Sequence, residues 1–152
     1  MQLVRLGRAE ALAVLGGLLL ALGLSLPWYR TNPDNANARI DGARGSVTGW
    51  ESHPILHWPL LLAAAAPLIL AWVVVRDHQL SWPRGELTAV VAMIAVVLVL
   101  YVGVVDRPGE PSGQIQLRLG WYLAVLGALL EIAGGAIRAG GTERPRKPPG
   151  VL

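Results

Sequence analysis

Four blocks of apolar residues, separated by polar segments, constrain this chain more than any other feature of its sequence. They occupy Ala11–Trp28, Ile55–Val75, Leu87–Val105 and Leu119–Ile137. Each is close to the ~20 residues that a helix needs to cross the hydrocarbon core of a bilayer. Only 15% of the residues are charged, against roughly 25% in an average soluble domain. The sequence therefore predicts an all-α membrane protein with four transmembrane helices in an up-down bundle.

The distribution of basic residues predicts the orientation of this bundle. With four spans, both termini lie on one side, and that side carries eight of the 13 basic residues. These eight are Arg5, Arg8, Arg76, Arg84, Arg138, Arg144, Arg146 and Lys147. Segments rich in Lys and Arg are retained in the cytoplasm, so we expect both termini to be cytoplasmic. The alternative, a first block cleaved as a signal peptide, is disfavoured because Pro27-Trp28-Tyr29 is a poor neighbourhood for a peptidase that requires small residues.

The polar segments differ in character. The first outer loop, residues 30–53, is long enough for structure of its own, and Asp41-Gly42 can turn a small hairpin. We expect residues 1–139 to form the transmembrane bundle. Residues 140–152 contain three prolines and predict a disordered basic cytoplasmic tail.

The overall composition suggests the source. The chain has a single lysine, no phenylalanine and many Ala, Gly, Arg and Val residues, which is typical of a GC-rich bacterial genome. The expected location is the bacterial cytoplasmic membrane.

Small residues recur on two of the apolar blocks. On the first block they are Ala9, Ala13, Gly17, Ala21 and Ser25, and on the fourth a stripe contains Gly120, Ala124, Gly127, Glu131, Gly134 and Arg138. Lipid provides no hydrophobic force between helices, so close backbone approach over small residues supplies the contact. We expect both stripes to face other helices, within this chain or in a second copy.

Glu131 is the one ionisable residue well inside a predicted span, and such a residue is a functional hypothesis by default. One interpretation makes it a proton-binding or cation-coupled group. The other is structural: a neutral carboxyl donates to the Ala63 carbonyl, which Pro67 leaves without its helical partner, or the side chain reaches toward Arg138. In both cases we expect Glu131 to be uncharged and buried against the first or second helix.

A second group of candidate residues lies on the predicted outer face. Trp50 and Glu51 stand just before the second span, while Asp106 and Arg118 bracket the second outer loop. We expect the two outer loops to contact each other. We also expect Arg118 to pair with Glu51 or Asp106.

Several functions are disfavoured by what the sequence lacks. The chain has no cysteine, which excludes thiolate catalysis and cysteine-ligated metals, and it has no phosphate-binding loop of the Walker type.

Five outer residues are of metal-ligating types, namely Asp34, Asp41, Glu51, His53 and His57. However, Pro54 places His53 off the regular helix, so a metal site is not expected. The basic residues sit at helix ends, which argues against nucleic-acid binding. We expect no enzyme activity and no cofactor.

Three short stretches together suggest a family. They are Thr48-Gly49-Trp50-Glu51, the segment from Leu98 to Gly109, and the segment from Leu117 to Gly135. In these stretches the chain resembles small four-helix integral membrane proteins of actinobacteria that have no assigned activity. The resemblance implies the four-helix architecture and no particular chemistry.

The function expected from the sequence is that of a non-enzymatic accessory or scaffold subunit of a membrane complex. Its partners would be the lipid bilayer and either another membrane protein or a second copy of the chain. The alternative is a proton- or cation-linked small transporter or channel subunit that uses the buried carboxylate of Glu131.

Overall fold

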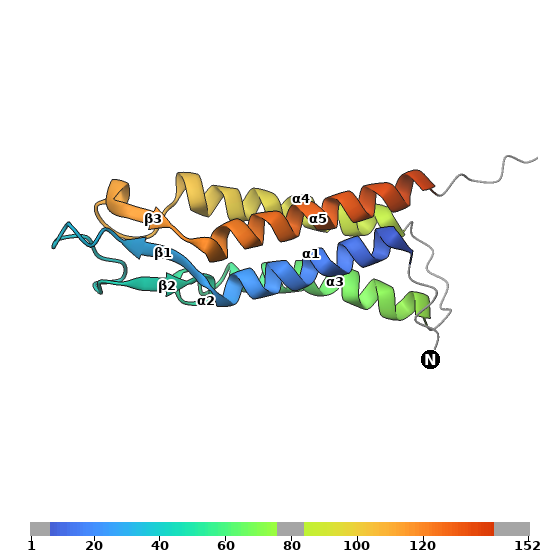
Figure 1. Ribbon diagram of the computed structural model, residues 1–152, viewed down its shortest axis with the longest axis horizontal. Helices are drawn as coiled ribbons and strands as arrows, with labels where there is room; N and C mark the ends of the chain where they lie inside the picture. The colour runs from blue at the N-terminus through green and yellow to red at the C-terminus, as the bar shows by residue number, and fades with distance from the viewer. Residues whose placement is uncertain (1–6, 76–83, 142–152) are drawn as a thin grey trace, which may run out of the picture.

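The computed structural model, which describes residues 7–75 and 84–141, is mostly helical and carries a small sheet at one end (Figure 1). Its long helices are α1 (Arg8–Ser25), α3 (His57–Val75), α4 (Arg84–Leu100) and α5 (Leu119–Gly141), and α4 continues into a π-helical turn, η2 (Tyr101–Val105). The shorter elements are β1 (Pro27–Thr31), β2 (Ser46–Thr48), α2 (Gly49–Ser52), the 3₁₀ turn η3 (Ser112–Gln114) and β3 (Ile115–Leu117). We call the part formed by residues 26–56 and 106–118 the head.

Among the residues that the structure describes, three helices are long and apolar enough to cross a membrane: Arg8–Ser25, Gly85–Val105 and Leu119–Gly140. The predicted span Ile55–Val75 corresponds to α3, which begins two residues later, at His57, and runs to Val75. The residues before it, around Pro54, form a turn instead of a helix. The helix α5 runs to Gly141 and so includes the first two residues of the expected tail, 140 and 141. Residues 142–152 lie outside the described part.

The first apolar block also divides differently from the prediction. The helix α1 ends at Ser25, and Leu26 is already extended with ψ 160°. Proline disfavours the helical conformation of the residue before it, so Pro27 ends the helix at this point. Trp28 therefore belongs to β1 rather than to the first helix.

Close backbone contact over small residues joins α1 to α5. A Cβ atom added to Gly127 would lie 2.5 Å from the backbone nitrogen of Leu20 and 2.6 Å from the carbonyl oxygen of Gly16. Gly120 and Gly134, which lie two helical turns before and after Gly127, approach the backbone of the α1 segment equally closely. The predicted stripe on α5 thus faces a helix of the same chain. The stripe predicted on α1 divides: Ala9 and Ala13 lie against Gly134 of α5, whereas Gly17 faces Ala64 and Pro67 of α3 and Ser25 is exposed. Gly16 and Gly23, which lie outside that stripe, also face α5.

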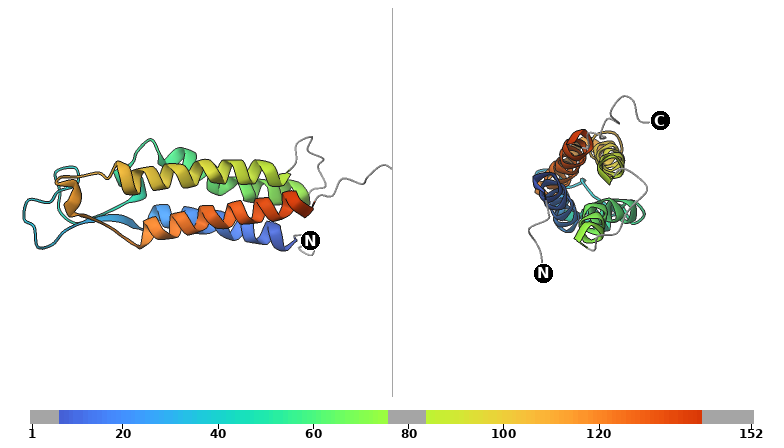
Figure 2. Two further views of the ribbon diagram at one scale, coloured as in Figure 1. Left: turned by 90° about the horizontal axis from the view of Figure 1, so that it is seen from above. Right: turned by 90° about the vertical axis from the view of Figure 1, so that its right-hand side faces the viewer.

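The long helices lie around a common axis, with α1 between α3 and α5 and with α4 beside α5 (Figure 2). Buried residues such as Leu20, Leu24, Leu60 and Val99 form the core between them. Large apolar side chains also cover the outward faces. They include Leu18, Leu22, Leu62, Ile69, Ile94, Val97, Leu126, Leu129 and Ile137. Such exposed apolar surface is unusual for a protein in water and suits a helix in lipid.

The head is built on an antiparallel sheet with the strand order β2-β1-β3. The register between β1 and β2 shifts between Pro27 and Tyr29. Because a bulge breaks the alternation of a strand, the consecutive residues Trp28 and Tyr29 are both fully buried. The predicted hairpin at Asp41-Gly42 is confirmed: both residues have positive φ, and Ile40 pairs with Ala43.

Replacing Gly127 with alanine tests the α1–α5 contact. The new methyl group would meet the backbone of Leu20 and Gly16, and overpacking of this kind costs about 1–3 kcal/mol. We expect a lower midpoint of thermal unfolding in detergent. Gly140→Ala on the same helix is the control, because nothing lies within 4 Å of that position. Equal stability of the two variants would contradict the close contact.

Candidate functional site

Glu131 is fully buried in the middle of α5, with 0% of its surface exposed. Its side chain lies against α1, where a Cβ on Gly16 would be 2.8 Å from Glu131 Cγ. This position agrees with the prediction that the small-residue stripe turns Glu131 toward other helices. Neither carboxyl oxygen has a hydrogen-bond partner among the residues that the structure describes.

Both predictions of a structural partner for Glu131 are wrong. The carboxyl makes no hydrogen bond to the Ala63 carbonyl, because the region of α3 around Pro67 packs against Gly17 of α1 instead. Arg138 forms an ion pair with Glu10 of α1. A buried polar group without a partner is costly, so packing alone does not explain why a carboxyl stands at this position.

A small cavity lies one helical turn from Glu131, toward the end where the chain termini are. Its volume is about 20 Å³, counted as the space open to the centres of water molecules. Its lining comes from all four long helices and consists of Ala9, Glu10, Ala13, Pro67, Leu70, Ala71, Gly85, Thr88, Gly134, Gly135 and Arg138. A cavity of this size holds about one water molecule if polar partners are present.

A second polar arrangement closes the opposite end of α4. The last carbonyls of a helix have no partner within the helix, and here three side chains donate to them, two from elsewhere in the chain and one, Arg107, from just after the helix. Trp121 Nε1 donates to the Val99 carbonyl at 2.9 Å, and the Tyr29 hydroxyl donates to the Val102 carbonyl at 3.0 Å. Arg107 Nε donates to the Gly103 carbonyl at 2.6 Å, and its Nη1 reaches the Ile115 carbonyl at 3.1 Å. The head and the helix end are therefore one hydrogen-bonded unit.

Tyr29 and His53 form the buried centre of this unit. The Tyr29 hydroxyl lies 3.0 Å from His53 Nε2. Since its single proton goes to the Val102 carbonyl, Nε2 must be the donor, which fixes the tautomer of a neutral His53. Burial raises the pKa of the Tyr29 phenol. Burial lowers the pKa of His53, and the charges of Asp106 and Asp41 oppose this shift in part.

Trp50 and Glu51 both serve local structure. Thr48 caps α2 by accepting from the Glu51 backbone N–H, and the Glu51 carboxylate accepts from the Thr48 N–H and hydroxyl. These hydrogen bonds lower the pKa of Glu51. Trp50 packs its ring 4.4 Å from that of His57. Gly49 has no room for a side chain because the indole of Trp28 lies against it, so every residue of the Thr48–Glu51 stretch has a structural role.

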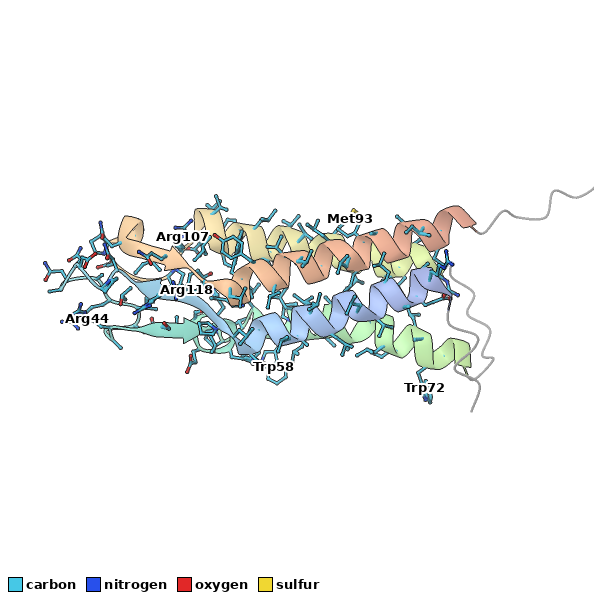
Figure 3. The ribbon with its side chains drawn as sticks, in the orientation of Figure 1. Arg44, Trp58, Trp72, Met93, Arg107 and Arg118 are labelled. Carbon is cyan, nitrogen blue, oxygen red and sulfur yellow. The ribbon has the colours of Figure 1, made fainter. Side chains whose placement is uncertain are left out.

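The predicted contact between the two outer loops is confirmed, but the predicted ion pair is wrong. Arg39 and Glu110 exchange two backbone hydrogen bonds of 2.9 Å, and the side chains of Asn32 and Gln114 bond at 2.7 Å. Arg118 is exposed and makes no ion pair with Glu51 or Asp106 in the described part of the chain (Figure 3). It contributes its backbone instead, since its N–H donates to the Trp28 carbonyl at 2.8 Å. Asp106 ends η2 and is exposed.

Sequence reasoning missed the residues that matter most at this end. They are Tyr29, Trp121 and Arg107, to which the sequence alone assigned no role. The sequence signal for Arg107 is its place just after an apolar block, where the helix carbonyls need donors. No group of three or more metal-ligating side chains occurs within residues 7–75 and 84–141.

Comparison of the chain with known family models, curated proteins and solved structures finds no match. The functional argument therefore rests on two features of the chain itself: the buried carboxyl with its nearby cavity, and the folded head.

The replacement of Tyr29 with phenylalanine tests the link between head and helix. It leaves the buried Val102 carbonyl without its donor, which costs about 1–3 kcal/mol. We expect a clear loss of thermal stability in detergent, measured by intrinsic tryptophan fluorescence. Tyr122→Phe is the matched control, because 55% of Tyr122 is exposed. A loss of the same size in both variants would argue against a specific bond at Tyr29.

The lowered pKa of His53 predicts a pH dependence of stability. Unfolded His53 takes up a proton near its ordinary pKa of about 6.5, whereas the folded protein does so only at lower pH. The contribution of neutral His53 is therefore complete above about pH 6.5 and declines as the pH falls below that value. We expect His53→Gln to lose part of the wild-type decline in unfolding temperature between pH 7.5 and pH 5. An unchanged pH profile would contradict this assignment.

Proposed function

We propose that this chain is a non-enzymatic integral membrane protein that crosses the bacterial cytoplasmic membrane four times and serves as an accessory or scaffold subunit. The observation that carries the proposal is the division of the protein surface into an apolar part along the helices and a polar part on the head. Large apolar side chains are exposed along the helices, whereas the head exposes charged and polar residues such as Arg30, Arg39, Asp41 and Glu110. The resemblance to small four-helix actinobacterial membrane proteins is compatible with this architecture.

Two exposed tryptophans support a fourth crossing by α3. Trp58 and Trp72 lie near its two ends and are 62% and 55% exposed (Figure 3). Fourteen residues of helix separate them by about 21 Å. Tryptophan favours the headgroup level of a bilayer, and 21 Å is about two thirds of the ~30 Å hydrocarbon core. The pair therefore suits a spanning helix around which the bilayer is locally thinner. The 19 residues of α3 are within the range of roughly 17–25 for a spanning helix.

The proposed orientation places both termini in the cytoplasm and the head outside, because eight of the 13 basic residues belong to the side of the termini. A reporter that is active only in the cytoplasm should work when fused to the C-terminus and fail when inserted at Asn35, in an exposed turn of the head. A periplasm-specific reporter at the same two sites supplies the reciprocal control. The reverse pattern would overturn the orientation.

The scaffold role is proposed from an open hollow on the head. It measures about 400 Å³ and is lined by Asn37, Arg39, Asp41, Gly42, Gly109 and Glu110. With a guanidinium and two carboxylates, it suits the polar rim of a protein interface better than a small apolar ligand. A photo-crosslinking residue at Asn37 should give an adduct of one defined mass in intact cells. The pair of changes Arg39→Ala and Asp41→Ala should weaken this adduct, and Arg44→Ala should not. An adduct that is insensitive to all three would contradict the role.

A proton- or cation-linked function is the second candidate, and the unpartnered buried carboxyl of Glu131 favours it. In liposomes with an imposed proton gradient, the purified wild-type protein should dissipate the gradient and Glu131→Gln should not. Glu86→Gln is the control, since Glu86 is an exposed acid at the start of α4. Equal flux in wild type and Glu131→Gln would exclude Glu131 as the coupling group, and no flux in any protein would leave the scaffold role as the better proposal.

A further inference from the structure

We infer that a second hollow on the head binds the phosphate group of a water-soluble ligand between Arg30 and Arg44. This hollow is separate from the one with two carboxylates described above. The inference goes beyond the scaffold role, because a phosphate site requires neither a protein partner nor the buried carboxyl of Glu131.

The hollow lies where β1 runs beside the turn that precedes β2. Its volume is about 220 Å³. Its lining consists of Arg30, Thr31, Pro33, Arg44 and Gly45. Pockets for drug-sized ligands measure about 300–1,000 Å³ and are mostly apolar. This smaller and basic hollow therefore suits a single anionic group.

The pairing of β1 with β2 brings the two arginines to the same place. Arg30 pairs with Ser46, the first residue of β2, and Arg44 stands two residues before Ser46. Both arginines are exposed, and both line the hollow. Two guanidinium groups from segments fourteen residues apart therefore border one space.

The backbone around the hollow is held by hydrogen bonds. The N–H of Thr31 donates to the Gly45 carbonyl, and the N–H of Gly45 donates to Thr31 Oγ1, both at 2.9 Å. Gly45 has a φ of +128°, which side chains rarely allow. Arg44 Nη2 donates to the Pro33 carbonyl at 3.0 Å. One of the two guanidinium groups is thus already held at the edge of the hollow.

Most donors of the two guanidinium groups remain free for a ligand. Each guanidinium carries five N–H donors. Arg30 makes no hydrogen bond or ion pair with any residue that the structure describes, and Arg44 uses only Nη2 to donate to such a residue. None of the described residues that line the hollow is acidic. Two positive charges therefore border one space without a counter-charge in its lining, and both attract an anion that enters it.

The amount of charge favours phosphate as this anion. A phosphate monoester carries a charge of about −1.5 to −2 at pH 7 and three acceptor oxygens, which matches two guanidinium cations. A carboxylate carries a single negative charge and would leave one cation uncompensated. The planar guanidinium group also binds phosphate through two parallel N–H···O bonds.

The distance of the hollow from the helices favours a water-soluble ligand over a lipid headgroup. With 18 residues, α1 is nearly as long as the hydrocarbon core is thick. Arg30 follows its last residue, Ser25, by five residues of extended chain, which cover about 16 Å. The strands lead away from the helices (Figure 1). Because the headgroup layer adds only about 5–8 Å on each side, the hollow of a membrane-spanning bundle lies beyond the lipid phosphates.

Binding of radiolabelled inorganic phosphate to the full chain tests the inference. Equilibrium dialysis in a maltoside detergent, which contains no phosphate, should show saturable binding of one phosphate per chain. Arg30→Ala and Arg44→Ala should each weaken binding at least tenfold, since each removes hydrogen bonds between charged groups. Arg118→Ala is the matched control and should bind like the wild type. Arg118 is exposed on the head but lies outside this lining, nearer to the helices than Arg44 (Figure 3).

Two further comparisons define the ligand. In phospholipid nanodiscs the affinity for free phosphate should equal that in detergent. Binding that disappears in nanodiscs would mean that lipid headgroups occupy the hollow, and it would overturn the water-soluble source. Arg30→Lys keeps the charge and loses the planar fork, so it should bind more weakly than the wild type and more strongly than Arg30→Ala.

Three other results would overturn the inference. One is the absence of saturable phosphate binding to the wild type. Another is binding that survives both Arg30→Ala and Arg44→Ala, or that falls equally in Arg118→Ala, which would mean a general attraction to the basic residues of the head. The last is acetate that displaces the labelled phosphate as well as unlabelled phosphate does at equal concentration, which would mean a carboxylate site.

Discussion

The rest of this structure depends on how the backbone carbonyls at the end of α4 are satisfied. In an apolar environment no water is available to accept or donate there, so the chain must supply its own donors. Tyr29, Arg107 and Trp121 do so from three different segments. The bonds from Tyr29 and Trp121 bring other parts of the chain to this helix end, whereas Arg107 donates to a carbonyl four residues before it. The head is consequently fixed to the helices by buried polar bonds as well as by the apolar packing of Trp28, Ile40 and Ile115.

The second constraint acts along the helices, away from the head, where α1 and α5 are in contact at glycine residues. With no side chains between them, the two backbones approach closely over several turns. Such close packing suits helices in lipid, where van der Waals contact replaces the hydrophobic effect as the force between helices. It also determines the surroundings of Glu131, which has α1 on one side and the cavity one turn away.

Much of this arrangement could be predicted from the sequence, because apolar block length and small-residue spacing report directly on helices. The contact of the small-residue stripe on α5 with another helix was predictable, as was the hairpin at Asp41-Gly42 with its positive φ angles. The ends of the elements were not, since Pro27 and Pro54 shorten the helices on either side of the head. The sheet was missed because its strands are only three to five residues long and because β1 pairs with β3 across more than eighty residues of chain.

The side-chain partners were the least predictable part of the candidate site. Opposite charges near each other in a loop suggested a pair for Arg118, but exposed ion pairs contribute little energy. Backbone hydrogen bonds position that segment instead. Likewise, Arg138 was considered for Glu131 because both lie on one helix, whereas Glu10 of α1 is its actual ion-pair partner. Spacing along one helix cannot identify a partner that a neighbouring helix provides.

The claim that two distant outer segments form one head fixed to the helices is tested most directly by a disulfide between them. Arg39 and Glu110 are an exposed pair joined by two backbone hydrogen bonds. Such pairs have a Cα separation of about 5.5 Å, within the range of about 4.4–6.8 Å that a disulfide spans. The chain has no cysteine of its own, so Arg39→Cys with Glu110→Cys should form an intramolecular bond under mild oxidation, visible as faster migration on a non-reducing gel. Arg44→Cys with Glu110→Cys should not. If the first pair stays reduced, or links only separate molecules, the two segments do not form the head described above.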